Sequence, residues 1–270
     1  MTRRDVKLKG TLAILVVACV LSALSCGGGS GGTAASPGAL SGNWEMTLTG
    51  TGTPPSGPTV MTESGFLTQS GSSLGGSILL SGATPCLGLG TMSGTVSGSN
   101  VAITVAQTGQ TVTLTGTATS GSTSMAGIYS VLASGCGAST VGTFTATQIK
   151  PLSGNFQATF TSGEFVGTVY DFAGKLTQEP NTGASFATLS GTMTSTNAPC
   201  IRSFSIAGLI RGTSVVFNFL ASDGSSQGQY RGTTTADGTT LTGTYDFLAQ
   251  SNGCFGDAGT VTMAFKPSSM

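Results

Sequence analysis

From about residue 40 onward, the chain consists of short runs in which apolar residues alternate with threonine, serine or other small residues. The first run places Trp44, Met46 and Leu48 on one face at a period of two. The same spacing recurs at Val101/Ile103/Val105, Phe156/Ala158/Phe160, Val215/Phe217/Phe219 and Val261/Met263/Phe265. This alternation predicts half-buried antiparallel strands, and no helical period follows the N-terminal segment.

The whole pattern occurs twice in the sequence, as an internal repeat. The stretch Leu40-Ser41-Gly42-Asn43-Trp44 recurs 112 positions later as Leu152-Ser153-Gly154-Asn155-Phe156. Further matched runs begin at Gly65 and Gly174, Pro85 and Pro199, Met125 and Leu241, and Gly135 and Gly253. The offset between the copies drifts, which marks small insertions in loops. We therefore expect two tandem β units at 40–150 and 151–267, each with about eight strands.

Turn signals lie between the predicted strands. They include Ser97-Gly98-Ser99-Asn100, Thr108-Gly109-Gln110 and Asp237-Gly238, which are typical of tight hairpins. Eight short strands joined by such turns, opened by Gly42-Asn43-Trp44, resemble the up-and-down barrels of the avidin and lipocalin group. The resemblance implies an all-β fold with one barrel per unit. A β-sandwich with Greek-key links is the alternative. Biotin binding is not implied, because Trp44 is the only tryptophan.

The first 26 residues have the three parts of an export signal. Basic residues up to Lys9 precede an apolar run, Thr11 to Leu24, which is too short for a spanning helix. The following Ala23-Leu24-Ser25-Cys26 resembles the bacterial lipobox. Cys19 fits the same pattern, but cleavage there leaves an apolar stretch on the mature chain. The whole sequence also resembles uncharacterised bacterial lipoproteins rich in serine, glycine and threonine.

This resemblance implies that Cys26 becomes a lipid-bearing N-terminus, followed by a flexible Gly/Ser-rich tether at 27–39. Gly27, in place of an aspartate after the cysteine, implies sorting to the outer membrane. An exported protein meets an oxidising compartment, so we expect its other four cysteines to form disulfides. The repeat favours pairing within each unit, Cys86 with Cys136 and Cys200 with Cys254. A thiolate metal or redox site is the alternative, but the chain has no CxxC motif.

Charge and composition exclude several kinds of activity. After Cys26 the chain holds six basic and nine acidic residues, a net charge of −3, without a basic cluster. Nucleic acid is therefore not an expected partner. The sequence contains no histidine, which removes Ser-His-Asp and Cys-His catalysis and histidine-ligated metals. We expect no cofactor and no catalytic constellation.

Carboxylates and aromatic residues remain as candidates for a site. Glu164, Asp171 and Glu179 lie close together in the sequence, yet we expect these acids, and Glu63 in the first unit, to be solvated. Asp171 and Asp246 each sit between a tyrosine and a phenylalanine, so both should face outward. Four aromatic residues recur at matching places and suit either the core or a barrel mouth that holds a small ligand: Trp44, Phe156, Tyr129 and Tyr245.

Three functional hypotheses follow. The first is a lipid-anchored cell-envelope protein that acts as a binding or interaction module for a small apolar ligand, an envelope protein or a glycan. The second is a structural surface lipoprotein without a small ligand. The third, a carboxylate-based hydrolase, needs two acids facing each other across a cleft, and no pair in the sequence points to one. A pocket with convergent polar groups inside either unit would favour the first hypothesis.

Overall fold

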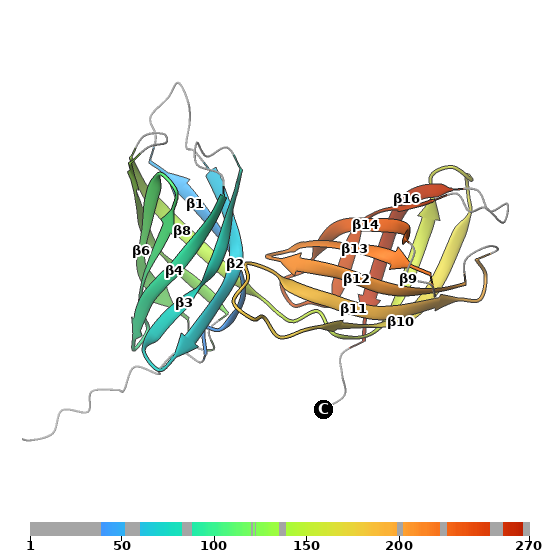
Figure 1. Ribbon diagram of the computed structural model, residues 1–270, viewed down its shortest axis with the longest axis horizontal. Helices are drawn as coiled ribbons and strands as arrows, with labels where there is room; N and C mark the ends of the chain where they lie inside the picture. The colour runs from blue at the N-terminus through green and yellow to red at the C-terminus, as the bar shows by residue number, and fades with distance from the viewer. Residues whose placement is uncertain are drawn as a thin grey trace, which may run out of the picture. The chain divides into compact units, whose positions relative to one another are not determined.

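The computed structural model describes residues 39–51, 60–82, 88–119, 121, 123–134, 139–198, 202–221, 226–248 and 256–266. These residues form sixteen β-strands, arranged in sequence order as two closed eight-stranded antiparallel barrels (Figure 1). The all-β, up-and-down prediction is therefore confirmed. The β-sandwich alternative is wrong, because in each barrel the first strand also pairs with the last.

Barrel 1 is formed by the first eight strands, each paired with its neighbours in the sequence. Its strands are β1 (Gly42–Gly50), β2 (Val60–Ser70), β3 (Ser73–Gly82), β4 (Gly88–Ser97), β5 (Asn100–Gln107), β6 (Gln110–Ala118), β7 (Ser124–Ala133) and β8 (Thr140–Ile149). Glycines with positive φ occupy two of its hairpin turns, Gly98 at 55° and Gly109 at 80°. A positive φ suits the tight turns that the sequence predicts there.

Barrel 2 repeats this topology. Its strands are β9 (Gly154–Ser162), β10 (Val169–Gln178), β11 (Ala187–Ser195), β12 (Ser203–Arg211), β13 (Ser214–Leu220), β14 (Ser226–Thr234), β15 (Thr240–Phe247) and β16 (Asp257–Phe265). The strand register is conserved between the barrels. Trp44 lies opposite Gly65, just as Phe156 lies opposite Gly174. The repeat in the sequence is thus a repeat in three dimensions, and paired strand positions in one barrel have counterparts in the other.

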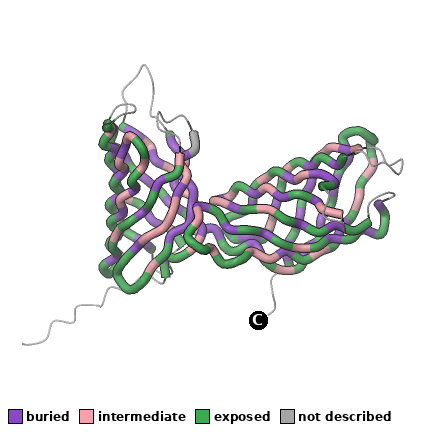
Figure 2. Tube along the Cα trace, viewed as in Figure 1, coloured by how far each residue is buried: buried purple, intermediate pink, exposed green. Residues whose placement is uncertain are grey.

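Buried and exposed residues alternate along the strands, as Figure 2 shows for both barrels. The apolar residues of the sequence pattern point inward and the threonines and serines point outward. Trp44, Tyr129, Phe156 and Tyr245 are all buried, which confirms them as core residues. Each closed barrel therefore encloses its own apolar core.

Inward-facing glycines make room for aromatic rings across the strands. A Cβ added at Gly174 would lie 2.6 Å from the Phe156 ring, and one at Gly142 would lie 2.6 Å from the Tyr129 ring. Both glycines are the strand partners of the aromatic residues concerned. A side chain at either position would collide with the ring, so glycine is needed where an aromatic residue lies flat against the wall.

Candidate functional site

The interior of barrel 2 is packed with aromatic rings. Phe160 lies at its centre, with ring centroids 4.9 Å from those of Phe172 and Tyr245. Three further rings, those of Phe204, Phe219 and Phe247, complete this group, with centroid separations of 4.9 to 6.0 Å. These distances are typical of favourable ring–ring contacts. We call these six residues the ring cluster.

Barrel 1 lacks most of the ring cluster. The strand registers place Leu48 where barrel 2 has Phe160, and Glu63 where it has Phe172. The counterparts of Phe204, Phe219 and Phe247 are Gly90, Val105 and Val131. Only Tyr245 keeps an aromatic counterpart, Tyr129. Five of the six positions therefore carry smaller or polar side chains in a barrel with the same number of strands.

Glu63 is the most unusual of these replacements. Its side chain is on the inward face of β2, between Met46 on β1 and Leu80 on β3, and it is 0% exposed. Neither carboxyl oxygen has a hydrogen-bond partner. Burial raises the pKa of Glu63 from 4.5 to about 7, because the interior disfavours the charged form. The expectation that Glu63 is a solvated acid is therefore wrong. The sequence does contain a signal for an inward side chain. Glu63 lies two residues after Met61 and four before Leu67, so all three share one face of the strand.

Tyr129 provides a second unpaired polar group in the same interior. Its hydroxyl is buried without a hydrogen-bond partner. In barrel 2 the equivalent Tyr245 donates a 2.6 Å hydrogen bond to Asp257, which also accepts a 2.6 Å bond from the Ser162 hydroxyl. Burial raises the pKa of the Tyr245 phenol, and the hydrogen bond to Asp257 raises it further. Barrel 1 has Thr140 at the position of Asp257, so Tyr129 has lost its acceptor.

In the strand register, Glu63 and Tyr129 occupy the positions of two residues that flank one core position in barrel 2. In barrel 2 their counterparts, Phe172 and Tyr245, both contact Phe160, and Leu48 takes the place of Phe160 in barrel 1. Two glutamines add polar groups to this interior: Gln110 donates a 2.7 Å hydrogen bond to Gln107, which in turn donates to the Gly88 carbonyl. Gln107 also occupies the space beside Gly90. We call Glu63, Tyr129, Leu48 and their surroundings the barrel 1 interior site.

Buried polar groups without partners are rare in native proteins, and each calls for an explanation such as a bound water, ion or ligand. Among the described residues, barrel 2 has two such atoms: the hydroxyl oxygen of Tyr230, whose ring stacks on Phe217 at 4.5 Å, and the Nε of Arg211. Barrel 1 has three such atoms, all on Glu63 and Tyr129. A buried carboxyl and a phenol can accept and donate hydrogen bonds to a guest. They do not provide a nucleophile paired with a base, as covalent catalysis requires.

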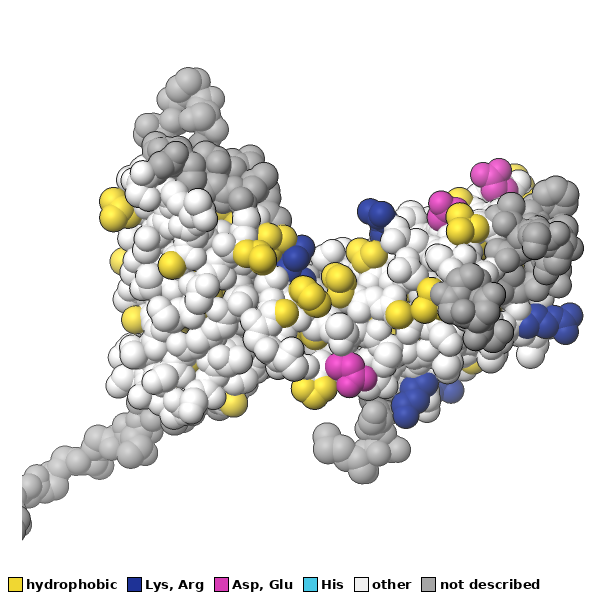
Figure 3. All heavy atoms as spheres, viewed as in Figure 1, with side chains coloured by type: hydrophobic (Ala, Val, Ile, Leu, Met, Phe, Trp, Pro, Cys, Tyr) yellow, Lys and Arg dark blue, Asp and Glu magenta, His cyan; other side chains and the backbone are white. Residues whose placement is uncertain are grey.

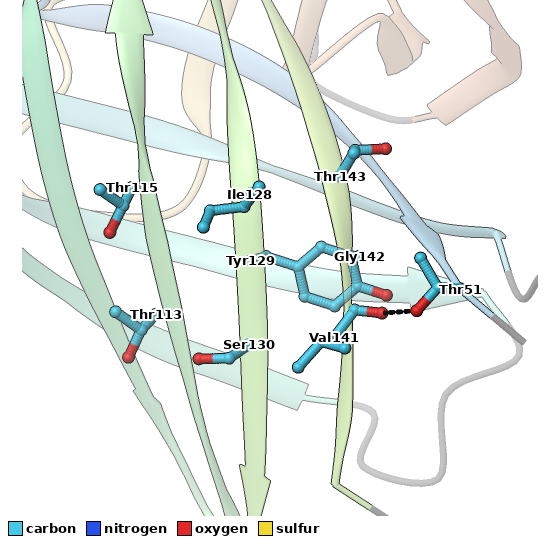
Figure 4. Close-up of a pocket in the computed structure, with 9 residues that line it drawn as sticks. All are labelled: Thr51, Thr113, Thr115, Ile128, Tyr129, Ser130, Val141, Gly142 and Thr143. Carbon is cyan, nitrogen blue, oxygen red and sulfur yellow. Dashed lines mark hydrogen bonds between the residues drawn. The ribbon is translucent and has the colours of Figure 1, made fainter.

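A second feature of barrel 1 lies on its outer wall. A shallow hollow of about 340 Å³ is lined by Ile128, Val141 and the edge of Tyr129, with Thr113, Thr115 and Thr143 among the hydroxyls around it (Figure 4). Ile128 is 65% exposed and Val141 59% exposed. No charged residue lines the hollow. On the face of barrel 1 that Figure 3 shows, the side chains are mostly neither charged nor hydrophobic.

The structure separates the other acids that the sequence singled out. Glu164, Asp171 and Glu179 are all exposed, and Asp171 and Asp246 face outward as expected. The carboxylate of Asp171 accepts a hydrogen bond from the Thr159 hydroxyl, and that of Glu179 accepts one from the Ser190 hydroxyl. No cluster of three or more acidic, histidine or cysteine side chains that could hold a metal occurs among the described residues. Cys19, Cys26, Cys86, Cys136, Cys200 and Cys254 lie outside the described residues.

None of the described residues forms a helix of the length and apolar character that crossing a membrane requires. No family model matches the chain, and no curated protein is similar to it at a significant level.

Among solved structures, the chain is similar to intact Ap-TbpB with its N and C lobes, at 10% identity and a TM-score of 0.23, over 86% of this chain and 77% of that one. It is similar to a mutant of the vaccine antigen Transferrin Binding Protein B from Haemophilus parasuis Hp5, at 9% identity and a TM-score of 0.22, over 86% and 76%. Kievitone hydratase from Nectria haematococca matches at 11% identity and a TM-score of 0.22, over 87% and 92%. Scores this low support no conclusion about function.

Proposed function

We propose that this chain is a lipid-anchored cell-envelope protein that binds a small molecule inside barrel 1, while barrel 2 has a filled core and serves as a structural unit. One observation carries the proposal: the carboxyl group of Glu63 is completely buried in barrel 1 with both oxygens unpaired, where barrel 2 has the ring of Phe172. A bound guest would satisfy these oxygens. An eight-stranded barrel is wide enough to hold one small ligand when its side chains do not fill it.

The location of the protein belongs to the same proposal and is supported by sequence alone. Residues 1–26 resemble a lipoprotein export signal, with Cys26 as the lipid-bearing residue, and 27–39 as the tether. Outer-membrane sorting is supported by Gly27. Intact-mass spectrometry of the membrane fraction tests this: a mature chain that starts at Cys26 with an added acyl mass is expected. A chain released by Cys26→Ser would support it, and an unacylated N-terminus elsewhere would contradict it.

Replacement of Glu63 by phenylalanine, the barrel 2 residue, tests the binding proposal. The wild-type protein, purified from its own membranes without denaturation, is expected to carry a small molecule that native mass spectrometry detects as an added mass. The Glu63→Phe variant is expected to lose that mass. Glu63→Leu, which introduces a smaller side chain, guards against a folding defect in the Phe variant. A wild-type protein without any guest, from envelopes and after exposure to a metabolite mixture, would contradict the proposal.

The outer-wall hollow favours a second candidate function, contact with an envelope protein. Large apolar side chains on a protein surface mark interaction sites when they gather in one place, and Ile128 and Val141 both line the hollow. A photo-crosslinking residue at position 128 or 141 is expected to give one discrete adduct in intact cells. The same residue at Thr104, on β5 of the same barrel, is the control. Equal labelling from all three positions would indicate non-specific contact.

A further inference from the structure

The chemical class of the guest follows from the charges around the barrel 1 interior site, and the inference rests on the proposed function. We infer that the barrel 1 interior site binds a small organic cation, with its ammonium group against the carboxylate of Glu63 and its apolar part between the surrounding side chains. Three features of barrel 1 support this inference: the missing positive partner, the apolar surroundings, and the hydrogen-bonding groups.

The first feature is the absence of basic residues from barrel 1. The sequence from Leu40 to Ile149 contains no lysine or arginine, and the whole chain contains no histidine. Glu45 and Glu63 are the only acidic residues in this range, and it contains no basic residue. A buried carboxylate is stable only when it is paired or neutralised. Because barrel 1 has no cation of its own to pair with Glu63, a guest must bring the positive charge if the carboxyl group is to ionise there.

The second feature is the apolar surroundings of Glu63. Its neighbours across the strands, Met46 and Leu80, are apolar and buried. The core of barrel 1 also includes Met61, Met92 and Met125, whose thioethers are polarisable and adapt to irregular shapes. Aromatic faces attract cations, and Tyr129 retains its ring in this interior. Such a lining suits a cation with a short hydrocarbon body, not a sugar or another guest that needs many polar contacts.

The third feature is the set of unpaired hydrogen-bond acceptors on Glu63 and Tyr129. A primary ammonium group has three donors and no acceptor. The two oxygens of Glu63 and the hydroxyl oxygen of Tyr129 are three unpaired acceptors. The three donors of an ammonium group therefore equal in number the three acceptors of Glu63 and Tyr129. At acidic pH the carboxyl group of Glu63 is protonated, because burial raises its pKa to about 7. Binding of an ammonium ion then ionises Glu63, and its proton passes to the solvent, so that the number of charges is conserved.

The test uses the full-length protein and three probes of similar length: butylammonium, 1-butanol and butyrate. Fluorescence of Trp44 follows barrel 1 specifically, because it is the only tryptophan and is buried in that barrel. Butylammonium is expected to raise the thermal midpoint of the Trp44 signal, whereas butyrate is not. Calorimetry at pH 6 in two buffers of different ionisation enthalpy is expected to show proton release on binding of the ammonium probe.

Two variants complete the experiment. Glu63→Gln keeps the shape of the side chain but removes its charge, and it is expected to weaken butylammonium binding by about 10- to 100-fold, the range for one charge-assisted hydrogen-bonded pair. Glu164→Gln, on an exposed loop of barrel 2, is the matched control and is expected to bind as the wild type does. If butanol binds as well as butylammonium and no proton is released, the cation inference is wrong and the proposed function stands. If no probe binds and native mass spectrometry finds no guest, both are wrong.

Discussion

The two barrels share strand number, strand order and register, yet their interiors differ. In barrel 2, Phe160 contacts four other rings, and the buried tyrosine beside it, Tyr245, has an acidic partner. In barrel 1, Leu48 replaces Phe160, and the counterparts of Phe172 and Tyr245 are a buried acid and a tyrosine whose polar atoms lack hydrogen-bond partners. The same pairing of eight strands is thus compatible with different side chains in the barrel interior. The buried polar groups of barrel 2 at this level, Tyr245, Asp257 and Ser162, bond to one another, whereas Glu63 and Tyr129 of barrel 1 have no partner.

The largest expected effect concerns a feature that the barrels share. The strand ends that flank Cys86 and those that flank Cys136 lie at the same end of barrel 1, because neighbouring strands alternate in direction. The same holds for Cys200 and Cys254 in barrel 2. We therefore propose one disulfide within each barrel, which would close a loop of about 50 residues and stabilise the barrel by about 4 kcal/mol in the chain-entropy model.

We expect the Cys86→Ser/Cys136→Ser variant to lower the free energy of unfolding that Trp44 fluorescence reports by that amount. The Cys200→Ser/Cys254→Ser variant serves as the control and should leave the Trp44 transition nearly unchanged. Peptide mapping without reduction provides an independent check. Recovery of a peptide that links Cys86 to Cys200 would rule out the pairing within barrels.

The next effect distinguishes the barrels by pH. Because burial raises the folded-state pKa of Glu63 above its unfolded value, folded barrel 1 binds its proton more tightly than the unfolded chain does. The stability from this group is fully present below about pH 4.5 and is lost as the pH rises through 7. The loss amounts to about 3 kcal/mol, since one pKa unit corresponds to about 1.4 kcal/mol. The nearest side chains across the strands, Met46 and Leu80, carry no charge that would offset it.

Urea unfolding followed by Trp44 fluorescence between pH 4 and 9 measures this loss without added ligand. Glu63→Gln is expected to remove most of the pH dependence of the barrel 1 transition. Glu164→Gln, whose side chain is exposed in the wild type, is expected to retain it. A wild-type barrel 1 that is equally stable at pH 4.5 and pH 8 would show that Glu63 is solvated or paired.

The smallest effect compares the two equivalent tyrosines. Tyr245→Phe removes the donor of a 2.6 Å bond to buried Asp257 and is expected to cost about 2 kcal/mol, the range for a hydrogen bond to a charged group. Tyr129→Phe removes a hydroxyl that has no partner and is expected to change stability by less than about 0.5 kcal/mol in the absence of a guest. Thermal unfolding of both variants by circular dichroism provides the comparison. Equal losses would mean that Tyr129 has a partner after all.

The sequence predicts the fold well because the signals for it are local. Alternation at Trp44, Met46 and Leu48, and glycine turns such as that at Gly98, specify strands and hairpins, and the repeat specifies two units. It predicts the interior site poorly. Glu63 looks like a surface acid until the register of β2 against β1 shows which way it points. The missing partner of Tyr129 becomes visible only when Thr140 is aligned with Asp257 through strand pairing, because the two loops differ in length.

The most direct test of the difference between the barrels is a high-resolution crystal structure of the protein purified from its own envelope. We expect electron density for a guest in barrel 1, within hydrogen-bond distance of the Glu63 carboxyl group and the Tyr129 hydroxyl, and continuous packing of rings in barrel 2. If protein side chains alone fill the space around Leu48 and provide partners for Glu63, barrel 1 is as filled as barrel 2 and the proposal of a bound guest is wrong.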